Sequence, residues 1–391
     1  MSIDIDCCQV KKYNQNAFGD YFVVKRILEE ERLIAVLSDG LGSGIKASIL
    51  ACMTATMLLR FVEEDTNIRK TAEIMMNSLP VCKVRKISYA TFTAVDCDED
   101  GNVRVVEEGN PDLVWMRGGR VLEVPCRQIP SQSFPDRQLK LYNFNVRQGD
   151  RLIVCSDGVT QAGLGEYKYK LGLRRAGLIE ILQKETGAHP DISSSDLARR
   201  IVAGAKAADP DGLAKDDISA CVIYFREPRR ALLFTGPPFD DAMDTYYATV
   251  FASFPGKKAV CGGTTANIMA RELMRPIKMS PGRVSGGLPP TGSMEGVDLV
   301  TEGILTLTRT LEYLERDTPE RLPGEKRDGA EQLKEFLLGS DEISIMMGSR
   351  PNQAHYDPDL PVEIEIRRNV IKKIKQILES KYFKKVNIQN I

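Results

Sequence analysis

Two stretches of the chain pass from consecutive apolar residues directly into the tripeptide Ser-Asp-Gly. Residues 33–37 lead into the copy that contains Asp39, and residues 152–155 lead into the copy that contains Asp157. An uninterrupted apolar run is typical of a strand buried on both faces. Each run therefore predicts a buried strand with a carboxylate at its tip. The repetition predicts that both acids lie at one rim of one core.

Alternating patterns at the start of the chain predict antiparallel partners for the first of these strands. Residues 2–10 alternate polar and apolar side chains, as expected of a strand half exposed to water. Residues 19–27 form a hairpin with residues 33–37 across a charged turn. Asp20 begins the first strand of that hairpin, so we expect it close to Asp39.

The rest of the first 226 residues shows strands and helices grouped by kind. A helix is expected over residues 45–62, with its stripe of Ile45, Ile49, Met53, Met57 and Leu58 in the core. Short strands joined by turns without intervening helices indicate antiparallel pairing, and sheet packed on sheet with helices outside. These strands are expected at 89–96, 103–107, 113–117, 121–124, 139–146 and 151–156, with helices at 68–79, 174–183 and 195–208, and with a final strand led by Asp216 and Asp217.

Beyond residues 227–230 the strand and helix patterns alternate instead. Such alternation predicts a parallel, doubly wound, Rossmann-like α/β sheet. We therefore expect two domains, residues 1–228 and a smaller one at residues 229–391. Its strands are expected at 231–235, 258–261, 297–305 and 342–347, its helices at 240–254, 264–274, 308–315 and 330–338, and a last strand followed by a helix within 362–383.

The amino-acid composition argues against several classes of function. The 391 residues carry a formal net charge of −1, which provides no overall field to attract nucleic acid or an anionic membrane. His189 and His355 are the only histidines, and neither is placed for a zinc hydrolase or a Ser-His-Asp enzyme. The nine cysteines form no Cys-x-x-Cys pair, and no apolar run reaches the length of a bilayer span. We expect a cytoplasmic protein with reduced thiols.

Acids stand at four predicted strand ends of the first domain: Asp20, Asp39, Asp157, and the pair Asp216 and Asp217. Hard oxygen ligands without histidine or thiolate suit magnesium or manganese. Clustered carboxylates repel one another unless a cation lies among them. Two such ions can ionise a shared water and neutralise a phosphoryl group under in-line attack. The expected chemistry is phosphate ester hydrolysis at a two-metal centre.

Four motifs occur in a fixed order: Phe18-Gly-Asp-Tyr, the stretch Leu-Ser-Asp-Gly-Leu-Gly-Ser-Gly-Ile-Lys-Ala from Leu37, Cys155-Ser-Asp-Gly-Val-Thr, and Asp216-Asp217-Ile-Ser. They resemble the metal motifs of the PPM (protein phosphatase 2C-like) family, and most closely its bacterial branch typified by the stage II sporulation protein E phosphatase domain. The resemblance covers residues 1–226. It implies an α-β-β-α sandwich that dephosphorylates phosphoserine or phosphothreonine on a partner regulatory protein.

The resemblance also implies roles for the acids of the motifs. Asp20, Asp39 and Asp157 are the expected catalytic residues, and the metal ligands are expected to be Asp20, Asp39, Gly40 through its carbonyl, Asp157, and Asp216 with Asp217 beside it. The implied cofactor is two Mn²⁺ or Mg²⁺ ions. Unlike the larger eukaryotic branch, this chain has no histidine before His189, so the general acid and the phosphate-binding residue are unassigned.

Two other functions compete with the phosphatase. The turn Gly40-x-Gly42-x-Gly44 could hold a nucleotide, but it lacks the adjacent Gly-Lys-Ser/Thr of a P-loop and the third glycine of a dinucleotide loop. A catalytically inactive phosphoprotein-binding module is the second alternative. Retention of every acid of the motifs argues against it.

The C-terminal half resembles no family, but it contains one glycine turn of interest. Residues 260–267 predict a strand, a glycine turn and a helix start. Backbone amides at such a start bind anions, so Gly262, Gly263, Thr264 and Thr265 are an expected site for a small anionic metabolite or nucleotide that regulates the phosphatase. Helix capping alone, or a protein-docking domain, is the alternative. We expect no nucleic-acid or membrane partner, and a homodimer is compatible with the sequence.

Overall fold

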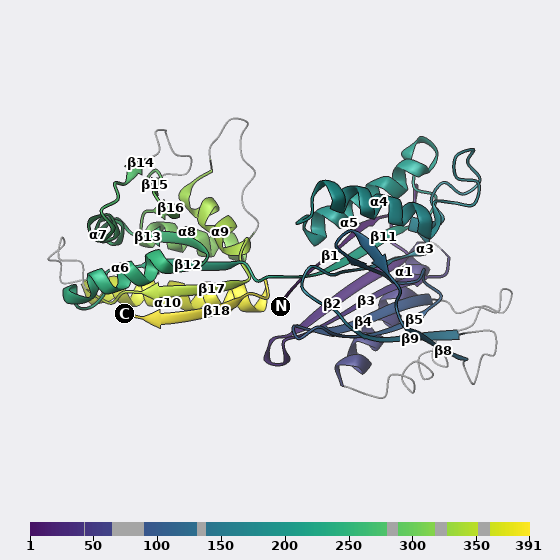
Figure 1. Cartoon of the computed structure of the whole chain (residues 1–391), viewed down its shortest axis with the longest axis horizontal. Helices are drawn as coiled ribbons and strands as arrows, with labels where there is room; N and C mark the ends of the chain where they lie inside the picture. Colours follow the sequence, from purple (N-terminus) through teal and green to yellow (C-terminus); the bar gives the residue numbers. More distant parts are fainter. Residues whose placement is uncertain (43, 65–89, 131–137, 280–287, 317–326, 351–359) are drawn as a thin grey trace. The chain divides into compact units, whose positions relative to one another are not determined.

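The computed structural model describes residues 1–42, 44–64, 90–130, 138–279, 288–316, 327–350 and 360–391. It contains two compact units, Met1–Glu227 and Pro228–Ile391 (Figure 1). The helix expected over residues 68–79 lies outside the described residues.

The N-terminal unit contains two antiparallel sheets, with strand orders β2-β3-β4-β5-β9-β8 and β1-β11-β10-β6-β7. The strands of the first sheet are β2 (Asp20–Ile27), β3 (Arg32–Gly40), β4 (Ala90–Asp98), β5 (Asn102–Glu108), β8 (Cys126–Pro130) and β9 (Gln138–Asn145). Those of the second are β1 (Ser2–Val10), β6 (Val114–Arg117), β7 (Arg120–Leu122), β10 (Arg151–Cys155) and β11 (Ile218–Arg226). Edge strand β8 was not predicted, because only Ile129 in it is buried and no alternation marks it.

The two sheets enclose one apolar core, and helices cover their outer faces. Leu33 and Leu37 of β3 meet Leu152 of β10 and Ile223 of β11 between the sheets. Helix α1 (Ile45–Glu63) packs on the outer face of β3 and β4, and helices α4 (Arg174–Ala188) and α5 (Ser194–Ala208) pack on the outer face of β10 and β11 (Figure 1). The predicted α-β-β-α sandwich is confirmed.

The face that α1 turns to the sheet differs from the predicted stripe in its first half. Ile45, Ile49 and Met53 are 71%, 54% and 54% exposed, and Ala47 and Ala51 are buried there instead. The reason is a close approach at the end of β3, where a Cβ on Gly40 would lie 2.1 Å from the carbonyl oxygen of Ala47. Only small side chains fit at that separation, so the larger ones point outward. The second half agrees with the prediction, because Leu58 is buried and Met57 packs against the core.

Helix α1 also changes the expectation about apolar runs. Among the described residues it is the one helix that is long and apolar enough to span a membrane by length and composition, with 39% of that window buried. The prediction that no run reaches this length is therefore wrong for α1. Its small residues pack on the sheet, as in a core helix of a globular domain.

The C-terminal unit contains a seven-stranded sheet in the order β14-β15-β16-β13-β12-β17-β18. The last five strands in that order are parallel, and β14 and β15 form an antiparallel edge. The strands are β12 (Arg230–Thr235), β13 (Lys257–Cys261), β14 (Lys278–Met279), β15 (Gly292–Met294), β16 (Val297–Thr301), β17 (Glu342–Met347) and β18 (Lys385–Asn390). The predicted parallel sheet is confirmed, with an antiparallel edge that the sequence did not indicate.

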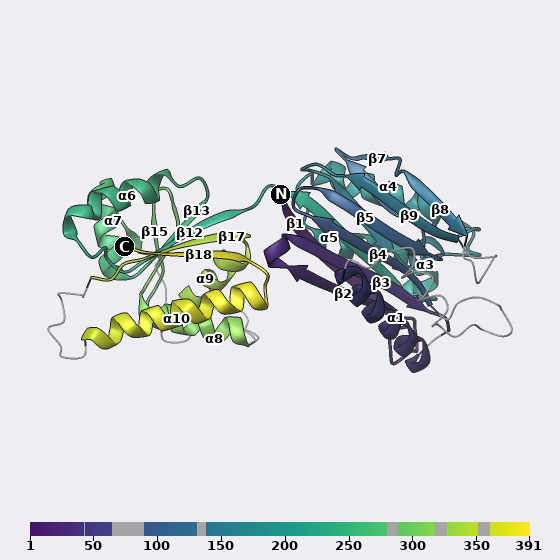
Figure 2. The ribbon, with the colours of Figure 1, turned by 90° about the horizontal axis from the view of Figure 1, so that it is seen from below.

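Helices cover both faces of this sheet. One face carries α6 (Asp244–Ser253) and α7 (Gly263–Leu273), and the other carries α8 (Ile304–Glu315), α9 (Gly329–Leu338) and α10 (Leu360–Ser380) (Figure 2). The predicted order of the last two elements is wrong, because α10 precedes β18. No element was predicted over Lys385–Asn390, whose alternating residues form β18 and join β17 in parallel.

Candidate metal centre

The first two acids of the site are brought together by strand register. In the hairpin of β2 and β3, Asp20 and Asp39 are directly opposite each other. After burial, the charge of Asp20 is the largest influence on the pKa of Asp39, as expected of neighbouring carboxyl groups. This confirms the prediction that the hairpin places Asp20 next to Asp39.

The second Ser-Asp-Gly tripeptide continues the cluster from the other sheet. Asp157 begins the short helix α3 (Asp157–Thr160) directly after β10, and its charge raises the pKa of Asp39. The side chain of Gln161 donates to Asp157 Oδ2 at 2.7 Å. Strand ends from both sheets therefore meet at Asp39.

The serine and glycine of each tripeptide have packing roles. Ser38 Oγ donates to the carbonyl of Thr91 at 2.8 Å, and Ser156 Oγ accepts from the backbone N–H of Ser219 at 3.1 Å, so each serine ties its strand end to the neighbouring strand. A Cβ on Gly158 would lie 2.0 Å from the carbonyl oxygen of Asp217. The residue after each acid is glycine because backbone from another segment lies against it.

Burial is the main reason why the pKa values of these carboxyl groups are raised, and neighbouring carboxylates add to it. Burial raises the pKa of Asp39 to about 9, together with the negative charges of Asp20, Asp157 and Asp216. Burial likewise raises the pKa of Asp20 to about 7, against hydrogen bonds from serine hydroxyls that favour its charged form. The pKa of Asp157 is raised by burial and then by the charge of Asp216. Buried acids that repel one another in this way are typical of a site that binds a cation.

The adjacent acids Asp216 and Asp217 have different environments. The Asp217 side chain is buried, and its carboxylate accepts the backbone N–H groups of Lys12 at 2.9 Å and Gly19 at 2.8 Å. The Asp216 side chain is 49% exposed, lies 3.6 Å from the Lys12 ammonium, and contributes to the negative field on Asp39. Asp217 therefore holds the loop that leads into Asp20, and Asp216 faces the cluster.

The donor set fits a divalent cation. Among the described residues, no three His, Cys, Asp or Glu side chains already form a group that could hold a metal ion. The charges of Asp20 and Asp157 act on Asp39, and Asp20 Oδ1 is buried without a hydrogen-bond partner. A divalent cation would neutralise those charges and satisfy that oxygen. Carboxylate oxygens suit Mg²⁺ or Mn²⁺, and the individual ligands stay a prediction.

Asn110 supports the strand end that carries Asp39, and sequence reasoning did not identify it. It is 5% exposed, its amide donates to Thr93 Oγ1 at 3.1 Å and to the carbonyl of Leu37 at 3.4 Å, and its Oδ1 accepts from Thr91 Oγ1 at 2.5 Å. Thr91 is the partner of Asp39 in the β3–β4 register. The Gly-Asn-Pro turn before β6 reads as an ordinary turn, so only the fold reveals this contact.

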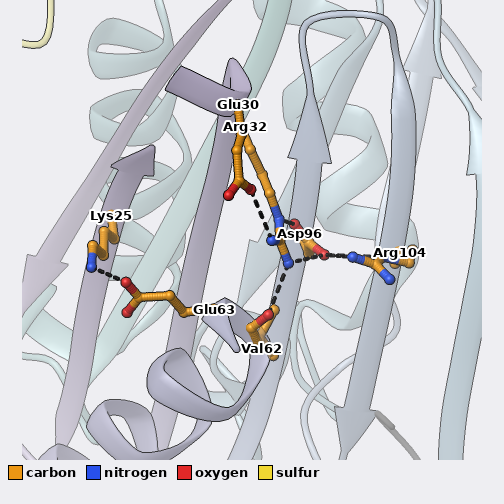
Figure 3. Close-up of polar contacts among 7 residues, drawn as sticks. All are labelled: Lys25, Glu30, Arg32, Val62, Glu63, Asp96 and Arg104. Carbon is orange, nitrogen blue, oxygen red and sulfur yellow. Dashed lines mark hydrogen bonds and ion pairs between the residues drawn. The ribbon is translucent and has the colours of Figure 1, made fainter. Parts of the chain in front are cut away.

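The far end of α1 is fixed by a charged network (Figure 3). Arg32 donates to the carbonyl of Val62 at 2.8 Å and to Asp96 at 2.7 Å, and Arg104 also donates to Asp96. The Arg32 side chain is 10% exposed and that of Asp96 is 5% exposed, so this ion pair is stronger than a surface one. Helix α1 is thus anchored at its C-terminal end, while its first turn lies beside Gly40.

The predicted anion site of the C-terminal unit lies at the start of α7. Gly262 precedes the helix with φ of +126°, a conformation that favours glycine, and no side chain caps the first turn. Gly263 and Thr264 are exposed, whereas Thr265 is 1% exposed. The predicted glycine turn and helix start are confirmed, and ligand binding there stays a prediction.

The layers and the convergent acids define the N-terminal unit as a domain of the PPM, protein phosphatase 2C-like, class. A sequence profile of the family "Stage II sporulation protein E (SpoIIE)" matches residues 29–226, half of the chain. The chain therefore belongs to the SpoIIE family, and the resemblance inferred from its motifs is confirmed.

Individual relatives are distant and longer. Stage II sporulation protein E of Priestia megaterium is 24% identical over 188 residues, which are 48% of this chain and 30% of the relative. The Bacillus subtilis protein of the same name is 23% identical over 149 residues, or 38% of this chain and 18% of the relative. The chain thus spans less than a third of the length of either relative.

Two solved structures are similar to the N-terminal part of this chain. The PP2C phosphatase domain and regulatory fragment of SpoIIE from Bacillus subtilis aligns with a TM-score of 0.47 and 18% identity, over 57% of this chain and 63% of that one. RsbX in complex with magnesium aligns with a TM-score of 0.40 and 18% identity, over 56% of this chain and 94% of that one.

Proposed function

We propose that this chain is a metal-dependent protein phosphatase that hydrolyses phosphoserine and phosphothreonine on a partner regulatory protein. The observation that carries the proposal is the convergence of Asp20, Asp39 and Asp157 from three strand ends, with pKa values raised first by burial and then by the charge of neighbouring carboxylates. Family membership supports the same activity.

The residues of the cluster have different roles: some would bind the metal ions, and others hold the metal ligands in place. Asp20, Asp39, Asp157, Asp216 and the carbonyl of Gly40 would hold two Mg²⁺ or Mn²⁺ ions. When bound, such ions supply an ionised water and positive charge against the phosphoryl oxygens. Gln161 orients Asp157 through its hydrogen bond, and Asp217 fixes the loop before Asp20 through two backbone amides.

We also propose a cytoplasmic location. The cysteines in the described part of the chain are all free thiols, and Cys97, Cys155, Cys221 and Cys261 are buried. Free thiols persist in a reducing compartment.

The test is a phosphatase assay on the full chain with p-nitrophenyl phosphate and with phosphoserine and phosphothreonine peptides. We expect turnover with Mn²⁺, none after chelation, and a loss of about a hundred-fold or more in Asp157→Asn. Asp100→Asn is the matched control, because Asp100 is exposed in the β4–β5 turn at the opposite end of these strands. Calorimetric titration with Mn²⁺ adds a readout that is independent of turnover.

Two results would count against the proposal. Turnover that survives chelation would exclude the metal-dependent reaction. Mn²⁺ binding that is lost in Asp157→Asn, combined with no turnover of any phosphopeptide by the wild type, would favour the inactive phosphoprotein-binding module.

A further inference from the structure

The carboxyl edge of the parallel strands in the C-terminal unit has the geometry of a ligand site. Helices α6 and α7 cover one face of the sheet, and α8, α9 and α10 cover the other (Figure 2). In such doubly wound sheets the strand ends and the helix starts that follow them form the usual binding edge. Nothing in the metal centre of the N-terminal unit uses these residues.

Two helix starts lie side by side at this edge. Helix α7 begins after Gly262 and helix α8 begins after Gly303, and neither has a side-chain cap. A Cβ on Gly303 would lie 3.5 Å from the Cα of Gly262, so the two turns are in contact. The first backbone amides of each helix lack intrahelical acceptors, and they carry the positive end of the helix dipole. At α7, Gly263 and Thr264 are exposed, so their amides are accessible.

Polar atoms without partners lie at the same edge. Thr235, the last residue of β12, is 0% exposed, and its Oγ1 has no hydrogen-bond partner. It pairs in register with Cys261 of β13, and strand alternation places both side chains on the face covered by α8. Cys261 Sγ donates to the carbonyls of Glu302 and Gly303, which places this row of side chains against the start of α8.

Glu302 provides a second such atom. Its Oε2 is buried and has no hydrogen-bond partner, and its charge raises the pKa of the Cys261 thiol in addition to the larger effect of burial. A buried hydroxyl or carboxylate oxygen without a partner has lost its hydrogen bonds to water and gained none in return, which destabilises the fold. Two of them at one strand edge indicate that a ligand completes the site.

The donors and acceptors at this edge select the chemistry of the ligand. Helix-start amides bind a phosphate, whereas the carboxylate of Glu302 would repel a second anion and accept hydrogen bonds from hydroxyl groups. We propose that the C-terminal unit binds a nucleotide, with its phosphate at Gly262–Thr265 and its ribose hydroxyls toward Glu302 and Thr235. Ligand binding here is independent of phosphatase turnover.

The experiment is calorimetric titration of the full chain with AMP, ADP, ATP and GTP, and with inorganic phosphate and adenosine as the separate halves of the ligand. The decisive variant is Gly263→Asp. A Cβ at this position meets no atom within 4 Å, and an acid in the first turn suits the helix dipole, so the variant is expected to fold. Its carboxylate would repel a phosphate. Gly263→Asn is the matched neutral control.

We expect at least one nucleotide to bind the wild type more tightly than phosphate or adenosine does. Gly263→Asp should weaken that binding about tenfold or more, and Gly263→Asn should change it far less. Glu302→Gln should weaken nucleotide binding without changing the affinity for inorganic phosphate. Circular dichroism checks that the variants are folded.

Three outcomes would overturn the proposal. One is that no nucleotide of the panel binds the wild type. A second is that inorganic phosphate binds as tightly as the best nucleotide, which would reduce the site to a simple anion site. The third is nucleotide binding that is equally strong in Gly263→Asp, which would place it elsewhere on the chain.

Discussion

Two neighbouring acids should respond to the same substitution in opposite ways. Asp217 is buried and accepts the backbone N–H groups of Lys12 and Gly19, whereas Asp216 is half exposed and faces the acid cluster. We predict that Asp217→Asn lowers the stability of the N-terminal unit. Asp216→Asn should leave stability unchanged or slightly raised, while it abolishes most of the phosphatase activity.

The magnitude follows from the hydrogen bonds of Asp217. An asparagine keeps one acceptor oxygen, so one of the two backbone N–H groups would face an amide NH₂ and lose its acceptor. A buried donor without a partner costs about 1–3 kcal/mol, and the remaining bond loses its charge assistance, so we expect a loss of about 2–4 kcal/mol. At roughly 2–4 °C per kcal/mol for a unit of this size, Tm should fall by about 4–16 °C.

Asp216 Oδ1 accepts a single backbone N–H, that of Asp217 at 3.0 Å, and an asparagine keeps one oxygen for that bond. Asp216→Asn removes instead a negative charge that raises the pKa values of Asp39 and Asp157. Without bound metal, the substitution should therefore reduce the repulsion among these carboxyl groups and leave the free energy of unfolding unchanged or slightly higher. If Asp216 is a metal ligand, the Mn²⁺-dependent rate should fall about a hundred-fold or more.

The assay is urea unfolding followed by tryptophan fluorescence in the presence of a chelator. The chain has a single tryptophan, Trp115, which is 9% exposed in the N-terminal unit, so the signal reports on that unit alone. Equal losses of stability in Asp216→Asn and Asp217→Asn would refute the assignment of separate roles. So would an Asp217→Asn variant as stable as the wild type.

Two further predictions concern buried polar residues near the strands of the site. Asn110→Ala should destabilise the N-terminal unit by about 2–3 kcal/mol, because three hydrogen bonds are lost. It should also raise the Mn²⁺ concentration needed for half-maximal turnover, because Asp39 would be misplaced. An unchanged Mn²⁺ requirement would confine Asn110 to a structural role. Burial raises the pKa of Glu107 to about 7, so the folded state resists its ionisation and wild-type stability should fall as pH rises from about 4.5 to 7. The unfolding free energy of Glu107→Gln relative to wild type should therefore increase over that interval, and a flat difference in urea titrations across it would contradict this reasoning.

The local sequence pattern was sufficient to predict most helices and strands and to identify the acids at the strand ends. Uninterrupted apolar runs marked β3 and β10, alternation marked β1, and the charged turn between β2 and β3 set the register that faces Asp20 with Asp39. These features are encoded by residues within one hairpin or one strand, where backbone geometry leaves few alternatives.

Packing between distant segments decided what the pattern could not. The apolar residues in the first turns of α1 point away from the sheet because Gly40 lies against Ala47. The helical periodicity of the sequence does not reveal this close approach. The α10–β18 order was misread because β18 is a strand only through its parallel pairing with β17.

The sequence by itself determined which acids this protein carries and that they stand at strand ends. The tertiary structure alone decided their division of roles, since Asp217 is bound by amides of Lys12 and Gly19 that lie about 200 positions earlier in the chain, whereas Asp216 faces the cluster. The physical reason is that burial and hydrogen-bond partners belong to the packed chain, and these set what a carboxylate can do.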